Sequence, residues 1–334
     1  MAEFDVTGLD TQGFVVAQGF LTADDLAVLR EDYAAAPLNP NFNYPLRTPS
    51  PAALGRLQQR IDSVVALVNE HTSSCVDMHA SANYFATGVA TGIDFAWHQD
   101  HESWFMVQDH HDYLNFYLPV VKPDVARSNL SVVPFDALRR AAPRAHEMLI
   151  DGGASHVQWI GGRCVAVSDD GGAIRVVPGG FDALAETPPL EAGDLLLLRG
   201  DVVHRTQDTS TARVALSVRV ANSAAIVKRG RLAAGGVRKA LMMSRNAIVY
   251  QMAFQAFDEA GTDQLAVGEL DRRLQSMSPP VALRRRDFLR QLAGEKRRAH
   301  ALSSFARDLP MAAVLAGVTR AQTLLASRRS TVTA

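Results

Sequence analysis

The sequence predicts a mostly β fold with helices: a jelly-roll core, N-terminal helices and a C-terminal helical extension. Short apolar and β-branched runs separated by turn residues occupy the middle of the chain. Two segments with helical spacing lie before most of these runs, and the last third is rich in Ala, Leu, Arg and Gln. An order of helices followed by strands is typical of a sandwich or jelly roll that carries helices.

The composition is that of a soluble globular protein. Of the 334 residues, 47% are hydrophobic and 21% are charged, which excludes wholesale disorder. No apolar run approaches the roughly 18 residues of a membrane span, and the first residues are acidic where a signal peptide would be basic and then apolar. We therefore expect a cytoplasmic protein with no membrane partner. Cys75 and Cys164 lack metal-type spacing, so we expect two small buried hydrophobes.

Charge divides the chain into two parts near Ser223. Residues 225–334 contain nineteen Lys and Arg against eight Asp and Glu, a net charge of +11, which leaves fifteen against twenty-seven, or −12, for residues 1–224. Most glycines and prolines and nine of the ten histidines belong to the first part. The predicted domains are a jelly-roll domain over residues 1–223 and a basic helical extension over residues 224–334.

The N-terminal elements are a strand and two helices. Gly13–Phe20 is a short apolar run bounded by glycines. Thr22 can cap the helix that follows, and Asp24 and Asp25 complement its dipole. A proline- and asparagine-rich loop leads to a second amphipathic helix over Leu57–Val68.

Five strands are predicted after these helices. They are Val76–Phe85, Tyr113–Val121, Arg163–Val167, Leu195–Leu198 and Arg213–Val220. The last strand alternates, so that Arg213, Ala215, Ser217 and Arg219 share the face opposite its valines and leucine. A buried arginine is costly unless an anion satisfies it, and a carboxylate matches its planar fork. The sequence therefore indicates an anion site on this face.

The extension is predicted to be helical from the spacing of its apolar residues over Val237–Phe257 and again near Leu283–Leu292, with Pro279 and Pro280 between the two segments. No aromatic interleaving accompanies its basic clusters, so we expect no nucleic-acid partner. The extension is expected to pack on the first part or to form a homodimer; a flexible basic tail is the alternative. The apolar face expected to attach it includes Met242, Ile248, Val249 and Phe257.

Two places carry the residues of a metal site. His98 and Asp100 lie two apart in Trp97-His98-Gln99-Asp100, and side chains at that spacing on an extended segment point the same way. His204 follows the apolar strand that begins after Gly193 and a turn. Two histidines and one carboxylate on one face of an octahedral ion leave three positions for other ligands, as in non-haem Fe(II) oxygenases.

Neighbouring residues leave alternatives open. A different pair among His101, Glu102, His110 and His111 is a rival to His98 and Asp100, which are favoured by the preceding Trp97 and the extended spacing. Large aromatic side chains nearby are expected in the core rather than against a substrate; these are Tyr84, Trp104 and Phe105. Asn83 and Asn115 either line the barrel or close a turn.

Taken in order, these motifs resemble the phytanoyl-CoA dioxygenase-like family of Fe(II)- and 2-oxoglutarate-dependent oxygenases, over about residues 10–222. The segments that carry the resemblance are Gly13–Val16 with Leu21–Leu29, Trp97–Asp100, Ser128–Pro134, Gly193–Leu195, His204–Thr206 and Arg213. The resemblance implies a double-stranded β-helix in which His98, Asp100 and His204 hold Fe(II). It also implies that Arg213 binds the distal carboxylate of 2-oxoglutarate, that Thr206 helps to hold this cosubstrate, and that O2 is the second cosubstrate.

The chain departs from the family pattern in three ways. The loop between His204 and Arg213 is about two residues shorter than usual, so Arg219 on the same face is an alternative for the arginine role. The chain is longer near residues 135–190, where glycine pairs indicate turns of an insertion beside the site. The extension after residue 224 has no counterpart.

The function implied by the resemblance is a dioxygenase that hydroxylates, or otherwise oxidises a C–H bond of, a small organic substrate and releases succinate and CO2. Related halogenases carry a small residue in place of Asp100, so the carboxylate argues for hydroxylation. Two alternatives remain: a non-oxygenase metalloenzyme on a cupin-like barrel, which would not need Arg213, and a catalytically silent binding protein of the same fold.

Overall fold

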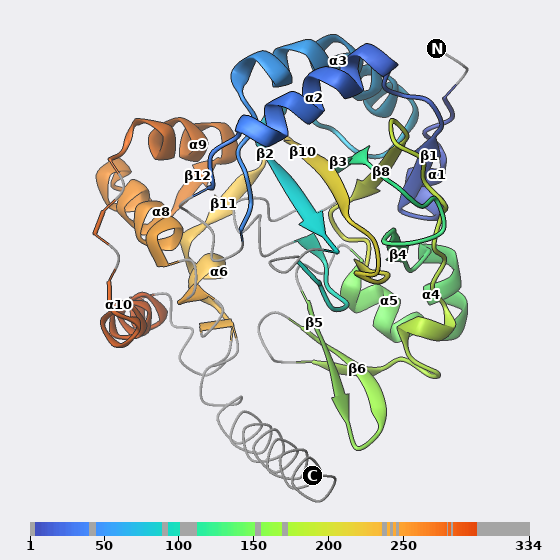
Figure 1. Cartoon of the computed structure of the whole chain (residues 1–334). Coiled ribbons are helices and arrows are strands. Elements are labelled where there is room, and N and C mark those ends of the chain that lie inside the picture. The colour runs from blue at the N-terminus through green and yellow to red at the C-terminus, as the bar shows by residue number, and fades with distance from the viewer. Residues whose placement is uncertain are drawn as a thin grey trace, which may run out of the picture.

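A five-stranded antiparallel sheet lies at the centre of the molecule (Figure 1). The computed structural model describes residues 4–39, 45–88, 93–100, 112–150, 155–168, 173–235, 239–240, 243–244, 247–278, 280–281 and 283–298. In sheet order the strands are β1 (Phe14–Ala17), β8 (Leu195–Arg199), β3 (Tyr113–Val121), β10 (Arg213–Ala221) and β2 (Met78–Thr87). The five predicted strands are thus present, four of them in this sheet, with ends that differ from the prediction by at most two residues.

The two faces of this sheet carry different kinds of side chain. Val214, Leu216, Val218 and Val220 of β10 belong to the core cluster that packs beneath the N-terminal helices. The opposite face carries Arg213, Ala215, Ser217 and Arg219, as the alternation predicted, and all four are buried. Because the helices cover only one face, the polar face is left for a site inside the molecule.

Two capped helices cover the first face of the sheet (Figure 1). Thr22 caps α2 (Ala23–Ala35) as predicted: its side chain accepts a hydrogen bond from the Asp25 backbone, and Asp25 Oδ2 accepts one from the Thr22 backbone at 2.9 Å. Ser50 caps α3 (Pro51–His71), and a proline begins its first turn. This helix is longer than predicted and buries Leu57, Ile61, Val64 and Val68.

The segment near 135–190 contains more structure than the predicted turns. It begins with two short helices, α4 (Phe135–Ala141) and α5 (Pro143–Leu149), and continues into a three-stranded sheet of β5 (Ser155–Ile160), β6 (Arg163–Ser168) and β7 (Ile174–Val176). The predicted turn at Gly161-Gly162 joins β5 to β6, with φ of 56° and 76°. The β5–β6 hairpin extends away from the central sheet (Figure 1). A last pair of strands, β4 (Leu130–Val132) and β9 (His204–Thr206), was too short to predict.

The extension packs on the end of the central sheet. Its described helices are α6 (Arg229–Ala233), α8 (Ala247–Ala260), α9 (Val267–Ser276) and α10 (Arg285–Arg298). An unpredicted ribbon of β11 (Ile226–Lys228) and β12 (Gln264–Ala266) accompanies them. Phe254 and Phe257 share one buried cluster with Tyr113 of β3 and Ala221 of β10. Ile248 and Val249 are half-buried, and Met242 lies outside the described residues. A flexible basic tail is therefore excluded for the described part of the extension.

One sequence expectation is wrong. Cys75 is exposed, because it lies in the surface turn after α3, where its backbone N–H donates to Asp112 Oδ1 at 2.8 Å. Cys164 is buried, as expected. Within the described ranges, no helix combines the length and the apolar character that crossing a membrane requires.

Candidate metal centre

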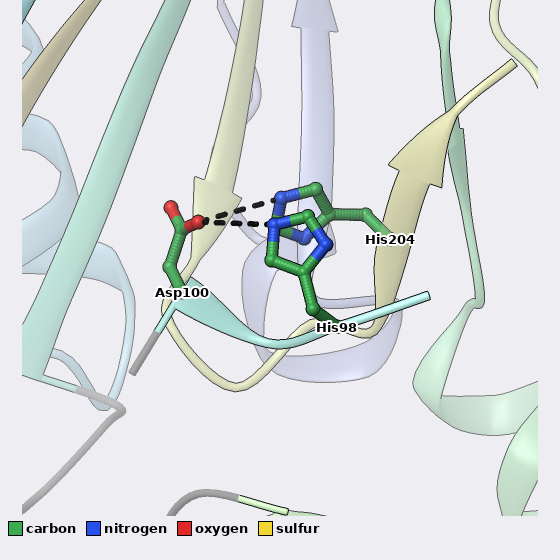
Figure 2. Close-up of side chains that lie close together, drawn as sticks. All are labelled: His98, Asp100 and His204. Atoms are coloured by element: carbon green, nitrogen blue, oxygen red, sulfur yellow. Dashed lines mark ion pairs between the residues drawn. The ribbon is translucent and has the colours of Figure 1, made fainter. Parts of the chain in front are cut away.

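The candidate metal ligands come from two segments that pair through their backbones. His98 and His204 form an isolated β-bridge in which the N–H of each residue donates to the carbonyl oxygen of the other at 2.9 Å. Figure 2 shows both imidazole rings turned toward the carboxylate of Asp100. Asp100 Oδ1 lies 3.8 Å from His98 Nε2 and 3.5 Å from His204 Nε2. The three ligand atoms lie within 4.8 Å of one another, close enough to meet at one ion.

Both imidazoles are held in the tautomer that a metal needs. His98 Nδ1 lies 2.7 Å from the carbonyl oxygen of Ala96, and His204 Nδ1 lies 3.0 Å from that of Val202. An Nδ1–H that donates to a carbonyl leaves the lone pair of Nε2 directed at the ion. Burial, reinforced by the nearby His204, lowers the pKa of His98 to about 4. His98 is therefore neutral at physiological pH, which is its ligand form.

Asp100 stays ionised although only 4% of it is exposed. Burial disfavours the carboxylate, but the charge of Arg219, together with His204, holds the pKa of Asp100 below its usual range. Arg219 Nε lies 3.7 Å from Asp100 Oδ2. The amide of Asn115 donates to the same Oδ2 at 2.8 Å, and the Ser217 hydroxyl donates to Asn115 Oδ1 at 2.7 Å.

The residue between the two ligands of the first motif also has a defined place. The Gln99 amide donates to the carbonyl oxygens of Leu149 at 2.8 Å and of Asp201 at 2.6 Å. Gln99 is 1% exposed, and its contact with Asp201 joins residues 102 positions apart. This side chain therefore ties the His98–Asp100 segment to the turn that carries His204.

A cavity opens onto the three ligands. Its remaining lining residues are Leu46, Phe85, Thr87, Ile93, Phe95, Gln99, Asn115, Tyr117, Leu130, Thr206, Arg213, Ser217 and Arg219. Residues of the central sheet and residues of the β4–β9 pair both contribute to this wall, so the cavity lies between the two sheets. The wall has an apolar part, and most of its other residues carry polar or charged groups. The apolar part consists of Leu46, Phe85, Ile93, Phe95 and Leu130.

Arg213 lies in this cavity with no acidic partner among the residues that the structure describes. It is 2% exposed, and its guanidinium donates to the Tyr117 hydroxyl. Burial raises the pKa of Tyr117 against the opposing charge of Arg213, so the phenol stays protonated. Within the described ranges, no carboxylate lies at salt-bridge distance from Arg213, and its Nε has no hydrogen-bond partner. Such a guanidinium is suited to bind an anion.

Thr206 lies in the wall of the same cavity. Its hydroxyl oxygen accepts a hydrogen bond from the Phe95 backbone at 3.1 Å, so the hydroxyl proton is available for a ligand. Arg219, the sequence alternative to Arg213, stands six residues farther along β10, or roughly 20 Å between the two α-carbons. Arg219 faces Asp100, whereas Arg213 faces Tyr117.

Two of the alternatives left open by the sequence are decided. Asn115 lines the cavity, whereas Asn83 accepts a hydrogen bond from the Asn39 amide at 2.9 Å and is not part of the cavity wall. Tyr84 is a core residue, 1% exposed, whose hydroxyl donates to Asp32 at 2.8 Å. The rival residues and the other two aromatic side chains lie outside the described residues; these are His101, Glu102, Trp104, Phe105, His110 and His111.

Sequence reasoning missed four residues of the centre. Gln99, Tyr117 and Ser217 were given no role, and Arg219 was considered only as a cosubstrate ligand. The available signal was the alternation of side chains along β10. Ser217 and Arg219 alternate with the apolar residues of this strand and line the cavity with Arg213. This alternation does not reveal which strand pairs with β10, so the contact between Asn115 and Asp100 could not be anticipated.

The sequence matches no protein-family model and no curated protein. Among solved structures, the chain is similar to the non-heme alpha-ketoglutarate-dependent carbocyclase SnoK of nogalamycin biosynthesis, with a TM-score of 0.42 and 13% identity over 64% of this chain and 81% of that one. AviO1 from Streptomyces viridochromogenes Tue57 is similar with a TM-score of 0.43 and 14% identity, over 67% of this chain and 98% of AviO1. EctD from S. alaskensis, whose structure was determined with 2-oxoglutarate and 5-hydroxyectoine, is similar with a TM-score of 0.42 and 13% identity. The similarity covers 65% of this chain and 74% of EctD. Similarity at this level assigns no residue, so the centre is judged from its own side chains.

Proposed function

We propose that the protein is an Fe(II)- and 2-oxoglutarate-dependent dioxygenase that hydroxylates, or otherwise oxidises a C–H bond of, a small organic molecule. One observation carries the proposal. Two imidazole Nε2 atoms and one carboxylate oxygen converge in a buried cavity that also contains an arginine with no carboxylate partner among the described residues. The ligand set suits a non-haem Fe(II) centre, and the arginine suits an anionic cosubstrate.

His98, Asp100 and His204 would hold the iron. Their chemistry fits the ion, because His98 is neutral and Asp100 is ionised at physiological pH. Bound Fe(II), with O2 and 2-oxoglutarate, would supply the oxidative decarboxylation that releases succinate and CO2 and drives oxidation of the substrate. The three protein ligands leave three positions of an octahedral ion for these partners.

Arg213, Thr206 and Tyr117 would bind the distal carboxylate of 2-oxoglutarate. Arg213 supports this assignment better than Arg219, since Arg219 already has Asp100 as its counter-ion. The Tyr117 hydroxyl accepts a hydrogen bond from the Arg213 guanidinium. The buried Nε of Arg213 remains to donate to a bound carboxylate. A carboxylate placed there would satisfy a buried charge that has no counter-ion among the residues the structure describes.

The apolar part of the wall would bind the substrate and exclude water from the reacting atoms. Leu46, Phe85, Ile93, Phe95 and Leu130 favour a small organic molecule with an apolar portion. Hydroxylation is favoured over halogenation because Asp100 takes a ligand position that a halide would need. The position of the cavity between the central sheet and the β4–β9 pair supports a double-stranded β-helix.

Succinate formation tests this proposal. Purified protein should be supplied with Fe(II), 2-oxoglutarate and O2, with and without ascorbate and without a prime substrate. A dioxygenase is expected to release succinate slowly and to require all three components. Hydrolysis of model esters without succinate would favour a non-oxygenase metalloenzyme, and cosubstrate binding without turnover would favour a silent binding protein.

A further inference from the structure

We infer that Asn115 is a positioning residue of the metal centre, which holds Oδ2 of Asp100 so that Oδ1 alone faces the two imidazoles. The inference rests on the proposed function, because it concerns how the proposed ligand Asp100 is presented to the ion. Asn115 lies on β3, 15 positions after Asp100, and its amide donates to Asp100 through a buried hydrogen bond of 2.8 Å.

The two oxygens of Asp100 have different surroundings. Oδ1 is the oxygen near His98 Nε2 and His204 Nε2, at 3.8 and 3.5 Å. Oδ2 accepts the hydrogen bond from Asn115 and lies 3.7 Å from Arg219 Nε. A carboxylate that is free to rotate can exchange its oxygens, but one whose second oxygen is hydrogen-bonded presents a single oxygen to an ion.

Asn115 is itself held in one orientation. An amide can rotate to interchange its oxygen and its nitrogen, and only one arrangement lets it donate to Asp100. The ionised Asp100 carboxylate can only accept, so the amide nitrogen faces it, and the Ser217 hydroxyl then donates to Asn115 Oδ1 at 2.7 Å. Asn115 is 4% exposed and Ser217 is 2% exposed, and they lie on the paired strands β3 and β10. The chain Ser217–Asn115–Asp100 is thus buried throughout.

Asn115 and Arg219 act on Asp100 in different ways. The register of β3 and β10 places Asn115 directly opposite Arg219, so the two side chains approach the same carboxylate oxygen. At 3.7 Å the guanidinium contributes charge rather than a hydrogen bond. The neutral amide contributes direction without changing the charge of the centre. Replacing Asn115 therefore removes the hydrogen bond to Asp100 and keeps the formal charge of the centre.

The test measures the affinity of the full-length protein for Mn(II). Binding is followed by electron paramagnetic resonance, without oxygen and without 2-oxoglutarate. Asn115→Leu keeps the approximate size of the side chain and removes the hydrogen bond. We expect the Kd for Mn(II) to rise about 10- to 100-fold, the usual effect of losing an outer partner of a metal ligand. Asn83→Leu is the matched control: Asn83 is also a buried asparagine of the central sheet, lies opposite Ser217, and contacts Asn39 instead of Asp100. Its Kd should stay within about twofold of the wild type.

Thermal unfolding of each metal-free variant separates folding from metal binding. If Asn115→Leu does not fold, Ser217→Ala decides the matter, with an expected rise in Kd of about 2- to 10-fold. The inference is overturned if a folded Asn115→Leu protein binds Mn(II) with wild-type affinity. Where Asn115→Leu does not fold, wild-type affinity in Ser217→Ala overturns it. An equal loss of Mn(II) affinity in Asn83→Leu also overturns it. A wild-type protein that binds Mn(II) but forms no succinate would refute the proposed function and leave this inference standing. A wild-type protein that does not bind Mn(II) would refute both.

Discussion

Arg219 and Asp100 form a buried ion pair at the metal centre, with Arg219 Nε 3.7 Å from Asp100 Oδ2. Each side chain is at most 5% exposed, so neither charge is screened by bulk water. The pair explains why a carboxylate can remain ionised inside the protein before any cation is bound. It also distinguishes two arginines of one strand: Arg219 has Asp100 as its counter-ion, whereas Arg213 contacts the Tyr117 hydroxyl and has no carboxylate partner among the described residues.

Replacement of His204 by alanine should abolish metal binding and turnover. The variant removes one of three ligands, and the two that remain are both on the His98–Asp100 segment. Metal content after reconstitution and succinate release are the measurements. His71→Ala, at the exposed end of α3, is the control and should bind metal normally. Full turnover by His204→Ala would refute the ligand assignment.

Replacement of Arg213 by alanine should raise the requirement for 2-oxoglutarate far more than the requirement for substrate. Losing a bidentate contact between opposite charges corresponds to about 2 to 4 kcal/mol, or very roughly a 30- to 1000-fold rise in the apparent KM for the cosubstrate. Initial rates of succinate formation at varied 2-oxoglutarate provide the test. If Arg219→Ala produces this pattern and Arg213→Ala does not, the two arginines have been assigned the wrong way round.

Replacement of Asp25 by asparagine should destabilise the protein by about 1 to 2 kcal/mol near pH 7, because Asp25 completes the capping box of α2 and pairs with Arg56 and Arg60. Burial opposes ionisation, but the hydrogen bonds from Thr22, with the two arginines, lower the pKa of Asp25 below its ordinary value.

The pH dependence of this effect follows from the direction of the shift. A carboxyl group with a lowered pKa in the folded state stabilises the protein above its unfolded pKa of about 3.9, and that contribution is lost as the pH falls through the folded value. The difference in Tm between wild type and Asp25→Asn should therefore be largest near neutral pH and shrink below about pH 4. A difference that grows on acidification would contradict the assignment.

Truncation after Ser223 should lower the Tm and cause aggregation. It would expose Tyr113 and Ala221, which are buried against the extension at 1% and 0% exposure. Light scattering of the full-length protein shows in addition whether the extension holds a homodimer together. Truncation after Arg298 is the comparator, because it keeps every described residue of the extension. A truncated protein that remains soluble, stable and active would make the extension an independent appendage.

The fold was largely predictable where a single strand or helix carries its own pattern. The alternation in Arg213–Ala221 identified the buried polar face, and Thr22 with Asp25 identified the start of α2. The three-residue strands β4, β9, β11 and β12 are too short to show a period, so their pairs escaped prediction. The exposure of Cys75 depends on where the turn after α3 lies in space, which residue type does not reveal.

The centre was predictable to the same degree. Spacing along extended chain brought His98 and Asp100 together, and the family resemblance of the ordered motifs added His204. The supporting contacts could not be predicted in this way, because Asn115 reaches Asp100 only through the register between β3 and β10. Register is set by packing across the whole sheet, and no local pattern in either strand encodes it.

The bridge between His98 and His204 has a thermodynamic consequence for the whole chain. Since the two ligands belong to segments far apart in sequence, the binding site exists only after the chain has folded. An ion that binds the folded state alone stabilises it by mass action, by about 2.7 kcal/mol when its free concentration is 100 times its Kd. The melting temperature of this protein should therefore report how much of it is loaded with metal, even when no substrate is known.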